Sequence, residues 1–140
     1  MEKNNSVRAK RILEKAESEG RNFLLEPEVY ALLKLFGFKV PSHIFLKSGE
    51  KLKADSLKKI KSKEAVVKVV SPLIQHKSDV GGVALVKNSR REIELAMKEM
   101  KKRVGAAFAR LDKSHKISPA EVEESIRGFL IVERVNYLQV

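Results

Sequence analysis

Hydrophobic residues recur with helical spacing in three stretches of the chain. In each stretch an apolar residue returns every three or four positions, which places these side chains on one face of a helix. The first stretch is residues 6–19, which ends before Gly20, and the second is residues 27–36. The third follows Ser89, a suitable N-cap residue, and carries its apolar stripe over residues 93–104. We therefore predict three amphipathic helices, and we interpret the first two as scaffold.

Short runs rich in β-branched residues form a second pattern, which predicts strands. The four expected strands are residues 42–47, 65–70, 83–87 and 128–135. A modest helix is expected at residues 53–62, while residues 105–118 give mixed signals. Within that region residues 106–111 could extend the long helix, and Ser118 followed by Pro119 offers a new helix start. Helices that alternate with strands indicate a layered α/β or α+β domain, with helices packed on a small mixed sheet.

The run at residues 65–70 is the most informative of these strands. It is apolar and β-branched and is interrupted only by Lys68, which predicts a strand buried on both faces. Burying an unpaired ammonium group is strongly unfavourable. Lys68 should therefore either extend its stem to solvent or meet an anion held at the sheet. We favour the anion.

The loop after this strand gathers residues suited to phosphate chemistry. These residues are His76, Lys77, Ser78, Asp79, Gly81 and Gly82, and a Ser71-Pro72 break precedes them. A neutral imidazole can act as a general base or attack phosphorus, and paired glycines let backbone amides approach a phosphate. Plain alternatives stay open: His76 as a loop histidine with one ordinary hydrogen bond, Asp79 as a loop cap, and the glycines as a turn into the next strand. The spacing of a P-loop is absent from this segment.

Composition narrows the class of protein. The chain has 140 residues and no cysteine, so we expect one compact domain without disulfides or thiolate metal sites. No apolar run approaches the roughly 18 residues of a membrane span, and no apolar segment resembling a secretory signal follows the N-terminal residues. A cytoplasmic location is the natural expectation, and a cysteine-free composition rich in Lys and Glu also suits a thermophile.

The net charge of +11 raises the question of nucleic-acid binding. Six lysines between residues 51 and 63 form a dense basic run, a feature found in nucleic-acid-binding proteins. However, only 6% of the residues are aromatic, and none lies between these lysines to stack on bases. We favour a solvated lysine face, with the positive field attracting a nucleotide, coenzyme A or an acidic partner subunit.

One long motif carries a resemblance to a known family. It reads Lys68-x-x-Ser71-Pro72-x-x-x-His76-Lys77-Ser78-Asp79-x-Gly81-Gly82-Val83. This motif resembles the signature of the ATP-grasp domain in the beta subunit of ADP-forming (NDP-forming) acyl-CoA or acetyl-CoA synthetases, which are relatives of succinyl-CoA ligase. Similar residues also stand at Gly20-Arg21, Leu24 to Glu28, Gly37 to Pro41 and Gly128 to Glu133, so the likeness spans most of residues 8–135.

The resemblance implies roles for individual residues. Lys68 would bind nucleotide phosphates, and His76 would relay a phosphoryl group that arrives from a phosphohistidine on an alpha segment. Residues 132–135 would form the hinge strand whose backbone reads adenine, ending at Val135, with Glu133 near the sugar; an exposed glutamate at a strand end is the alternative. The remaining implied nucleotide contacts are Ser71, Lys77, Ser78, Asp79, Gly81 and Gly82.

The resemblance also implies a reaction, cofactors and partners. The reaction would convert acyl-CoA, ADP and phosphate reversibly to a carboxylic acid, coenzyme A and ATP. The cofactors would be ATP or ADP and Mg²⁺, with the metal ligands outside this chain. An alpha subunit or segment would supply the coenzyme A site and the first phosphohistidine, which makes a hetero-oligomer the expected assembly.

The same pattern divides the chain into a helical lead-in at residues 1–37 and a nucleotide-binding lobe at residues 38–140. This lobe would be the first of an ATP-grasp domain, truncated before the second. The alternatives are a noncatalytic nucleotide-binding module and, less favoured, a basic nucleic-acid-binding domain. His43 and His115 have no chemical partners nearby in the sequence, and we expect both to be surface or structural residues.

Overall fold

The chain folds into two compact units, Met1–Val40 and Pro41–Val140. The computed structural model describes residues 2–112, 114 and 116–135. His115 lies outside the described residues. The organisation expected from the sequence, one domain with a helical lead-in, stays a prediction.

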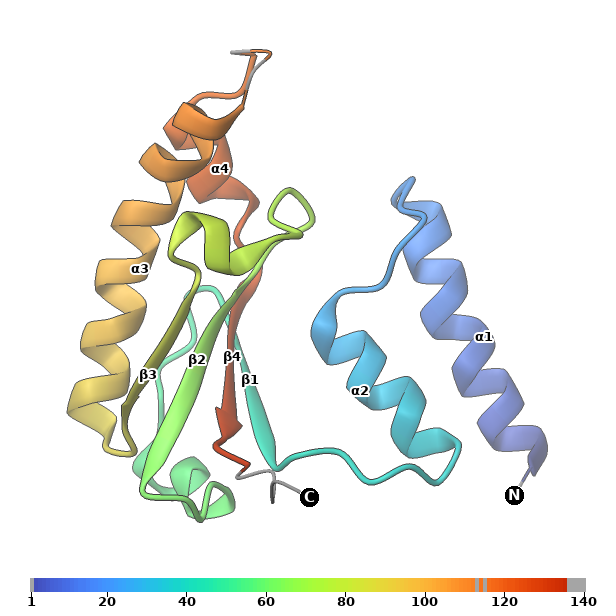
Figure 1. The fold of residues 1–140 in the computed structure, drawn as a ribbon. Helices are drawn as coiled ribbons and strands as arrows, with labels where there is room; N and C mark the ends of the chain where they lie inside the picture. The colour runs from blue at the N-terminus through green and yellow to red at the C-terminus, as the bar shows by residue number, and fades with distance from the viewer. Residues whose placement is uncertain (1, 113, 115, 136–140) are drawn as a thin grey trace, which may run out of the picture. The chain divides into compact units, whose positions relative to one another are not determined.

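The first unit is a helical hairpin made of α1 (Glu2–Ser18) and α2 (Glu26–Leu35) (Figure 1). These are the helices predicted at residues 6–19 and 27–36, although α1 begins before its apolar stripe. Gly20 follows α1 at φ +72°, in the left-handed conformation that ends many helices.

A buried arginine holds the two helices of this hairpin together. The Arg21 guanidinium donates two hydrogen bonds to the Glu28 carboxylate, at 2.7 and 3.1 Å, and one to Glu19 at 3.0 Å. Arg21 also donates to the carbonyl oxygen of Phe23 at 3.1 Å, and Glu28 accepts from the amide of Leu25 at 2.8 Å. Burial raises the pKa of Glu28, but the hydrogen bonds from Arg21 and Leu25 outweigh it, and the net pKa is lowered. The pair therefore fixes the connection between α1 and α2.

The second unit is built on a four-stranded sheet with the order β1-β4-β2-β3. Its strands are β1 (His43–Lys47), β2 (Glu64–Val70), β3 (Val83–Lys87) and β4 (Gly128–Glu133). They confirm the four predicted strands, but every pairing is antiparallel, so the sheet is not the mixed one expected. The reason is the strand order: β4 separates the parallel strands β1 and β2, and β2 separates the parallel strands β3 and β4. The modest helix expected after β1 is a 3₁₀ helix, η1 (Ala54–Lys59).

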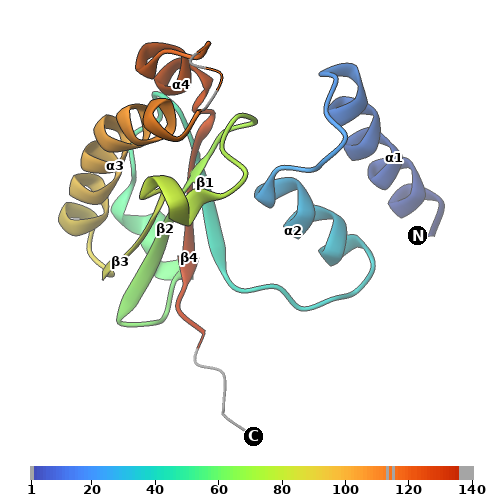
Figure 2. The same cartoon turned by 45° about the horizontal axis from the view of Figure 1, so that its top comes forward.

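Two helices belong to this second unit. The long helix α3 (Arg90–Leu111) packs on the sheet, and α4 (Pro119–Ser125) packs against α3 (Figures 1 and 2). Ser89 caps α3 by accepting from the amide of Glu92 at 3.3 Å, as predicted. The helix start offered by Ser118 is also used, because its hydroxyl caps the first turn of α4. Residues 106–111 therefore extend the long helix, and a new helix begins directly after Ser118.

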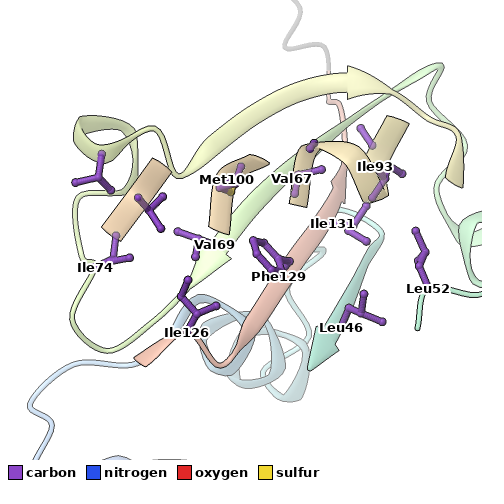
Figure 3. Close-up of a cluster of buried hydrophobic side chains, with 14 of the residues drawn as sticks. Leu46, Leu52, Val67, Val69, Ile74, Ile93, Met100, Ile126, Phe129 and Ile131 are labelled. Carbon is purple, nitrogen blue, oxygen red and sulfur yellow. The ribbon is translucent and has the colours of Figure 1, made fainter. Parts of the chain in front are cut away.

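The hydrophobic core lies between α3 and one face of the sheet (Figure 3). From β2 it takes Ala65, Val67 and Val69, each with 0% exposure, whereas Val66 and Lys68 are half-buried on the opposite face. The prediction of a strand buried on both faces is therefore wrong at Val66 and Lys68, although Val70 on the same face is 1% exposed. Other core side chains are Leu46, Ile93, Met100, Phe129 and Ile131.

Candidate functional site

Lys68 lies in the middle of β2, on the sheet face opposite α3. In the strand register its neighbours are Leu130 on β4 and Val83 on β3. Leu130 is fully buried, and Lys68 is half-buried. Apolar neighbours reduce the hydration of an ammonium group, so an anion at this face would offset part of its desolvation penalty.

The loop after β2 is held at two points by buried side chains. Ile74 is 2% exposed and Val80 is 5% exposed, and both belong to the hydrophobic core. A single 3₁₀ turn, η2 (Lys77–Val80), follows Ile74 and ends at Val80. With the apolar anchors facing inward, His76 and Asp79 remain on the exposed side. Ser78 is likewise exposed, and Lys77 is half-buried.

Ser71 begins the loop and faces the protein interior. It is 3% exposed, and its hydroxyl oxygen lies 2.6 Å from that of Ser125 in α4. The Ser71 oxygen also accepts from the amide of Leu73 at 3.1 Å, while Ser125 donates to the carbonyl oxygen of Val122 at 2.5 Å. The Ser71 hydroxyl is therefore committed to shaping the loop. Sequence reasoning missed Ser125, because no local pattern links it to the motif.

Gly81 and Gly82 end the loop in a tight turn. Gly81 has φ +71°, and a Cβ atom on Gly82 would lie 2.6 Å from Cγ1 of Val69. The Gly82 amide donates to the carbonyl oxygen of Lys77 at 2.7 Å, and the Gly81 amide donates to that of Ser78 at 3.3 Å. This geometry accounts for both glycines through the turn into β3, the alternative that the sequence left open.

A cavity of about 420 Å³ lies between the loop and the C-terminal end of α3. It is lined by Leu73, Ile74, Gln75, His76, Asp79, Val80, Phe108, Leu111 and Asp112. The His76 imidazole is exposed and forms no hydrogen bond with any described residue, including Asp79. The cavity thus offers an accessible imidazole beside an apolar wall and a carboxylate.

Asp112 contributes to this cavity but is already bonded elsewhere. Its carboxylate accepts from the Ser114 hydroxyl at 2.7 Å and from the Ile117 amide at 3.3 Å. The hydrogen bond from the Ser114 side chain, joined by backbone amides, lowers the pKa of Asp112. Sequence reasoning missed this residue and its neighbour Phe108, because they lie in the region with mixed signals and bear no motif.

Glu133 and Val135 lie toward the other end of the sheet from the loop. Glu133 pairs with Ala65 at the start of β2, and Val135 is exposed beyond the end of β4. The Glu133 carboxylate accepts from the amide of Ser42 at 2.9 Å. With a rise of about 3.3 Å per residue, the two ends of the seven-residue strand β2 lie roughly 20 Å apart. The structure therefore separates the predicted hinge residues from His76, with Lys68 between them along the strand.

The described residues offer no grouping suited to a metal ion. No cluster of three or more His, Cys, Asp or Glu side chains occurs in this part of the chain. Asp79 and Asp112 line one cavity, but Asp112 is engaged as described, so these residues do not fit a Mg²⁺ site. His43 is half-buried with its Nδ1 at 2.9 Å from the carbonyl oxygen of Pro41, a structural position. Among the described helices, none has the length and apolar character needed to cross a membrane.

Comparison with known sequences confirms the resemblance carried by the motif. Residues 15–129 match the ATP-grasp domain family model. Over 89 residues the chain is 40% identical to subunit beta of ADP-forming acetate–CoA ligase I from Pyrococcus furiosus, covering 63% of this chain and 37% of that protein. Over 132 residues it is 35% identical to the ADP-forming 4-hydroxybutyrate–CoA ligase of Nitrosopumilus maritimus, covering 94% of this chain and 17% of that protein.

Solved structures with a similar fold come from Ca. Korarchaeum cryptofilum. ACD1 in complex with coenzyme A matches with a TM-score of 0.65 and 25% identity, covering 92% of this chain and 49% of that chain. A structure of dinucleotide forming acetyl-coenzyme A synthetase 1 with coenzyme A, acetyl-coenzyme A and a phosphorylated phosphohistidine segment matches with a TM-score of 0.61 and 25% identity, again covering 92% and 49%. The chain thus spans about half the length of these neighbours.

Proposed function

Because the chain belongs to the ATP-grasp family, we propose that it forms the nucleotide-binding lobe of an ADP-forming acyl-CoA synthetase. The proposed overall reaction converts acyl-CoA, ADP and phosphate reversibly to a carboxylic acid, coenzyme A and ATP. Two relatives are ADP-forming CoA ligases, which supports this reaction class. Their names specify different acids, acetate and 4-hydroxybutyrate, so the proposal extends to carboxylic acids as a class and to no single acyl group.

His76 is the proposed phosphoryl relay. Its imidazole nitrogen attacks a phosphohistidine on a partner segment, so that one N–P bond forms while the other breaks. A terminal phosphate oxygen of ADP then attacks the phosphorus, and the N–P bond to His76 breaks as ATP forms. The observation that carries this proposal is the exposed His76 imidazole, unbonded to any described residue, at the wall of the 420 Å³ cavity. The phosphohistidine segment in a solved neighbour supports the donor chemistry.

Lys68 is proposed to hold the nucleotide phosphates. We propose that the nucleotide lies along the sheet face opposite α3, with its phosphates near Lys68 and its adenine near Val135. Glu133 would then stand close to the sugar. Charge-assisted hydrogen bonds to phosphate would offset the desolvation of the Lys68 ammonium. The proposed contacts at the phosphate end also include Lys77, Ser78 and Asp79.

Ser71, Gly81 and Gly82 are proposed to act on the nucleotide through the shape of the loop. The Ser71 hydroxyl is bonded inside the fold, and the amides of both glycines donate within the turn. Their contribution would be to keep the backbone close to the phosphates without an intervening Cβ atom.

The complete reaction needs components beyond the described residues. An alpha subunit or segment is the proposed source of the coenzyme A site and of the first phosphohistidine. Mg²⁺ bridges phosphate oxygens in reactions of this class, and its ligands are proposed to lie outside this chain. The expected cytoplasmic location and thermophile source stay predictions.

A noncatalytic nucleotide-binding module is the second candidate. It is favoured by one observation, the absence of a carboxylate cluster suited to Mg²⁺ within the described residues. Such a module would bind ATP or ADP through Lys68 and the loop without forming phosphohistidine at His76.

One experiment separates these functions. The purified chain is incubated with radiolabelled ATP and Mg²⁺, with and without a candidate alpha subunit, and assayed for a nucleotide complex and for acid-labile phosphate. The proposed relay predicts both in the presence of the alpha subunit. A nucleotide complex without labelled protein would favour the noncatalytic module. Absence of both, together with DNA or RNA binding that weakens steeply with salt, would favour the nucleic-acid alternative.

A further inference from the structure

Arg103 reaches from α3 to the end of the loop. Its Nε donates a hydrogen bond to the carbonyl oxygen of Gly81 at 2.9 Å. Gly81 closes η2 in the left-handed conformation, at φ +71° and ψ 27°. The arginine side chain lies so close that a Cβ atom on Gly81 would stand 2.8 Å from Nε and 3.2 Å from Cδ. A side chain at position 81 would therefore collide with Arg103 in its present position.

Gly82, the residue that follows Gly81, forms backbone hydrogen bonds with two other segments, η2 and β2. Gly82 donates to the carbonyl oxygen of Lys77 at 2.7 Å and accepts from the amide of Val69 at 2.9 Å. Lys77 opens η2 immediately after His76, and Val69 follows Lys68 in β2. Fixing this peptide therefore fixes both the turn that presents His76 and the strand end beside Lys68.

The turn η2 needs such an attachment because it is weak by itself. It has only four residues, and 3₁₀ hydrogen bonds are less favourable than those of an α-helix. The residue at its N-cap, His76, makes no side-chain cap hydrogen bond. Burial of Val80 holds the turn on its apolar side, and the bond from Arg103 holds the carbonyl that follows it.

We propose that Arg103 is a positioning residue for phosphate binding by this loop. By holding the Gly81 carbonyl, it keeps the turn from His76 to Gly82 in one conformation, so that the loop does not have to become ordered when nucleotide binds. The proposal rests on the proposed nucleotide-binding function. Arginine suits the task because its rigid planar group can direct one N–H at a carbonyl while retaining its charge beside the loop.

The experiment compares Arg103→Met with Lys102→Met in the full chain. Each variant removes one positive charge from α3. Only Arg103→Met removes the hydrogen bond to Gly81, because the exposed Lys102 forms no bond with that residue. Arg103→Lys retains the charge and a donor. Amide hydrogen exchange of the peptide covering residues 75–82 is measured without nucleotide, and the dissociation constant for ADP is measured by calorimetry.

Arg103→Met should accelerate exchange in this peptide by about three- to tenfold, the range expected for one lost hydrogen bond. Exchange in β4 and α3 should stay unchanged, ADP binding should weaken by a similar factor, and Arg103→Lys should restore part of both. Unchanged loop exchange, acceleration throughout the second unit, or faster loop exchange with unchanged ADP affinity would each overturn the proposal. Failure of the wild-type chain to bind ADP would instead refute the proposed function, and it is seen before any variant is compared.

Discussion

The hydroxyl groups of Ser71 and Ser125 lie 2.6 Å apart, although 54 residues separate them in the sequence. Ser125 gives its own proton to the carbonyl oxygen of Val122, so Ser71 must be the donor between the two hydroxyls. This bond ties the beginning of the loop to the C-terminal end of α4. The position of the loop therefore depends on α4, a helix that lies much further along the sequence.

Ser125→Ala should destabilise the protein and loosen the loop. The variant leaves the buried Ser71 hydroxyl without its acceptor, which should lower the free energy of unfolding by about 1–3 kcal/mol. Chemical denaturation of Ser125→Ala, Ser71→Ala and the double variant measures the coupling between the two side chains. Strictly additive losses would show that the two hydroxyls do not act as a pair.

Gly82→Ala should disrupt the loop more than a glycine-to-alanine substitution at a position with free space around it. The added Cβ atom would lie 2.6 Å from Cγ1 of Val69 and 3.0 Å from the carbonyl oxygen of Lys77. Overpacking of this kind typically costs about 1–3 kcal/mol. Gly49→Ala is the control, because that glycine has φ +88° but no atom near the position of a Cβ. Only Gly82→Ala should weaken ADP binding, and equal affinities in the two variants would contradict the proposed role of the turn.

The ion pair between Arg21 and Glu28 should make the first unit sensitive to acid. The pKa of Glu28 is lowered from its ordinary value of 4.5, so the unfolded chain takes up a proton before the folded chain does. The stabilising contribution is therefore complete above pH 4.5 and disappears as the pH falls through the lower, folded pKa.

Thermal unfolding of the wild type and Glu28→Gln, followed by circular dichroism between pH 7 and pH 2, measures this dependence. The stability advantage of the wild type should be largest at the upper end and should shrink below pH 4.5. An advantage that stays constant over the whole range would show that the charge of Glu28 does not stabilise the hairpin.

Local signals in the sequence predicted most helices and strands of the described residues, although β4 ends at Glu133, two residues before its predicted end. Ser89 and Ser118 begin helices because their hydroxyls cap the first turn, and such capping requires only neighbouring residues. The predicted burial of Val66 in β2 was too high. Its apolar character does not indicate whether another element covers that face of the sheet. Sequence pattern reports the character of a side chain but not the layer above it.

The sequence indicates which residues of the loop could carry chemistry, but it does not give their positions in space. The motif singled out His76, and the structure gives it an accessible position at a cavity. Long-range partners such as Arg103 and Ser125 were not found, because their contacts arise only when α3 and α4 pack beside the loop. The backbone hydrogen bonds of Gly82 to Lys77 and Val69 could not be predicted from the sequence pattern either.

Lys68→Ala should weaken nucleotide binding. Loss of a charge-assisted hydrogen bond to phosphate should raise the dissociation constant for ADP by about tenfold or more. Lys87→Ala is the matched control, because Lys87 lies on the same sheet face, opposite Glu64 at the other end of the β2 and β3 pair. Calorimetry that gives wild-type affinity for Lys68→Ala, or equal losses for both variants, would indicate a lysine that only extends to solvent.

The most direct test of the account is whether His76 itself carries phosphate. The chain is incubated with an alpha subunit, Mg²⁺ and ATP labelled at the terminal phosphate, and the phosphorylated residue is mapped by mass spectrometry at alkaline pH. His43→Asn serves as the control for His76→Asn, since His43 lies beside the carbonyl oxygen of Pro41 in a structural position. We predict acid-labile phosphate on His76 in the wild type and in His43→Asn, and none in His76→Asn. Rapid phosphoryl transfer to ADP by the His76→Asn variant would contradict the central claim.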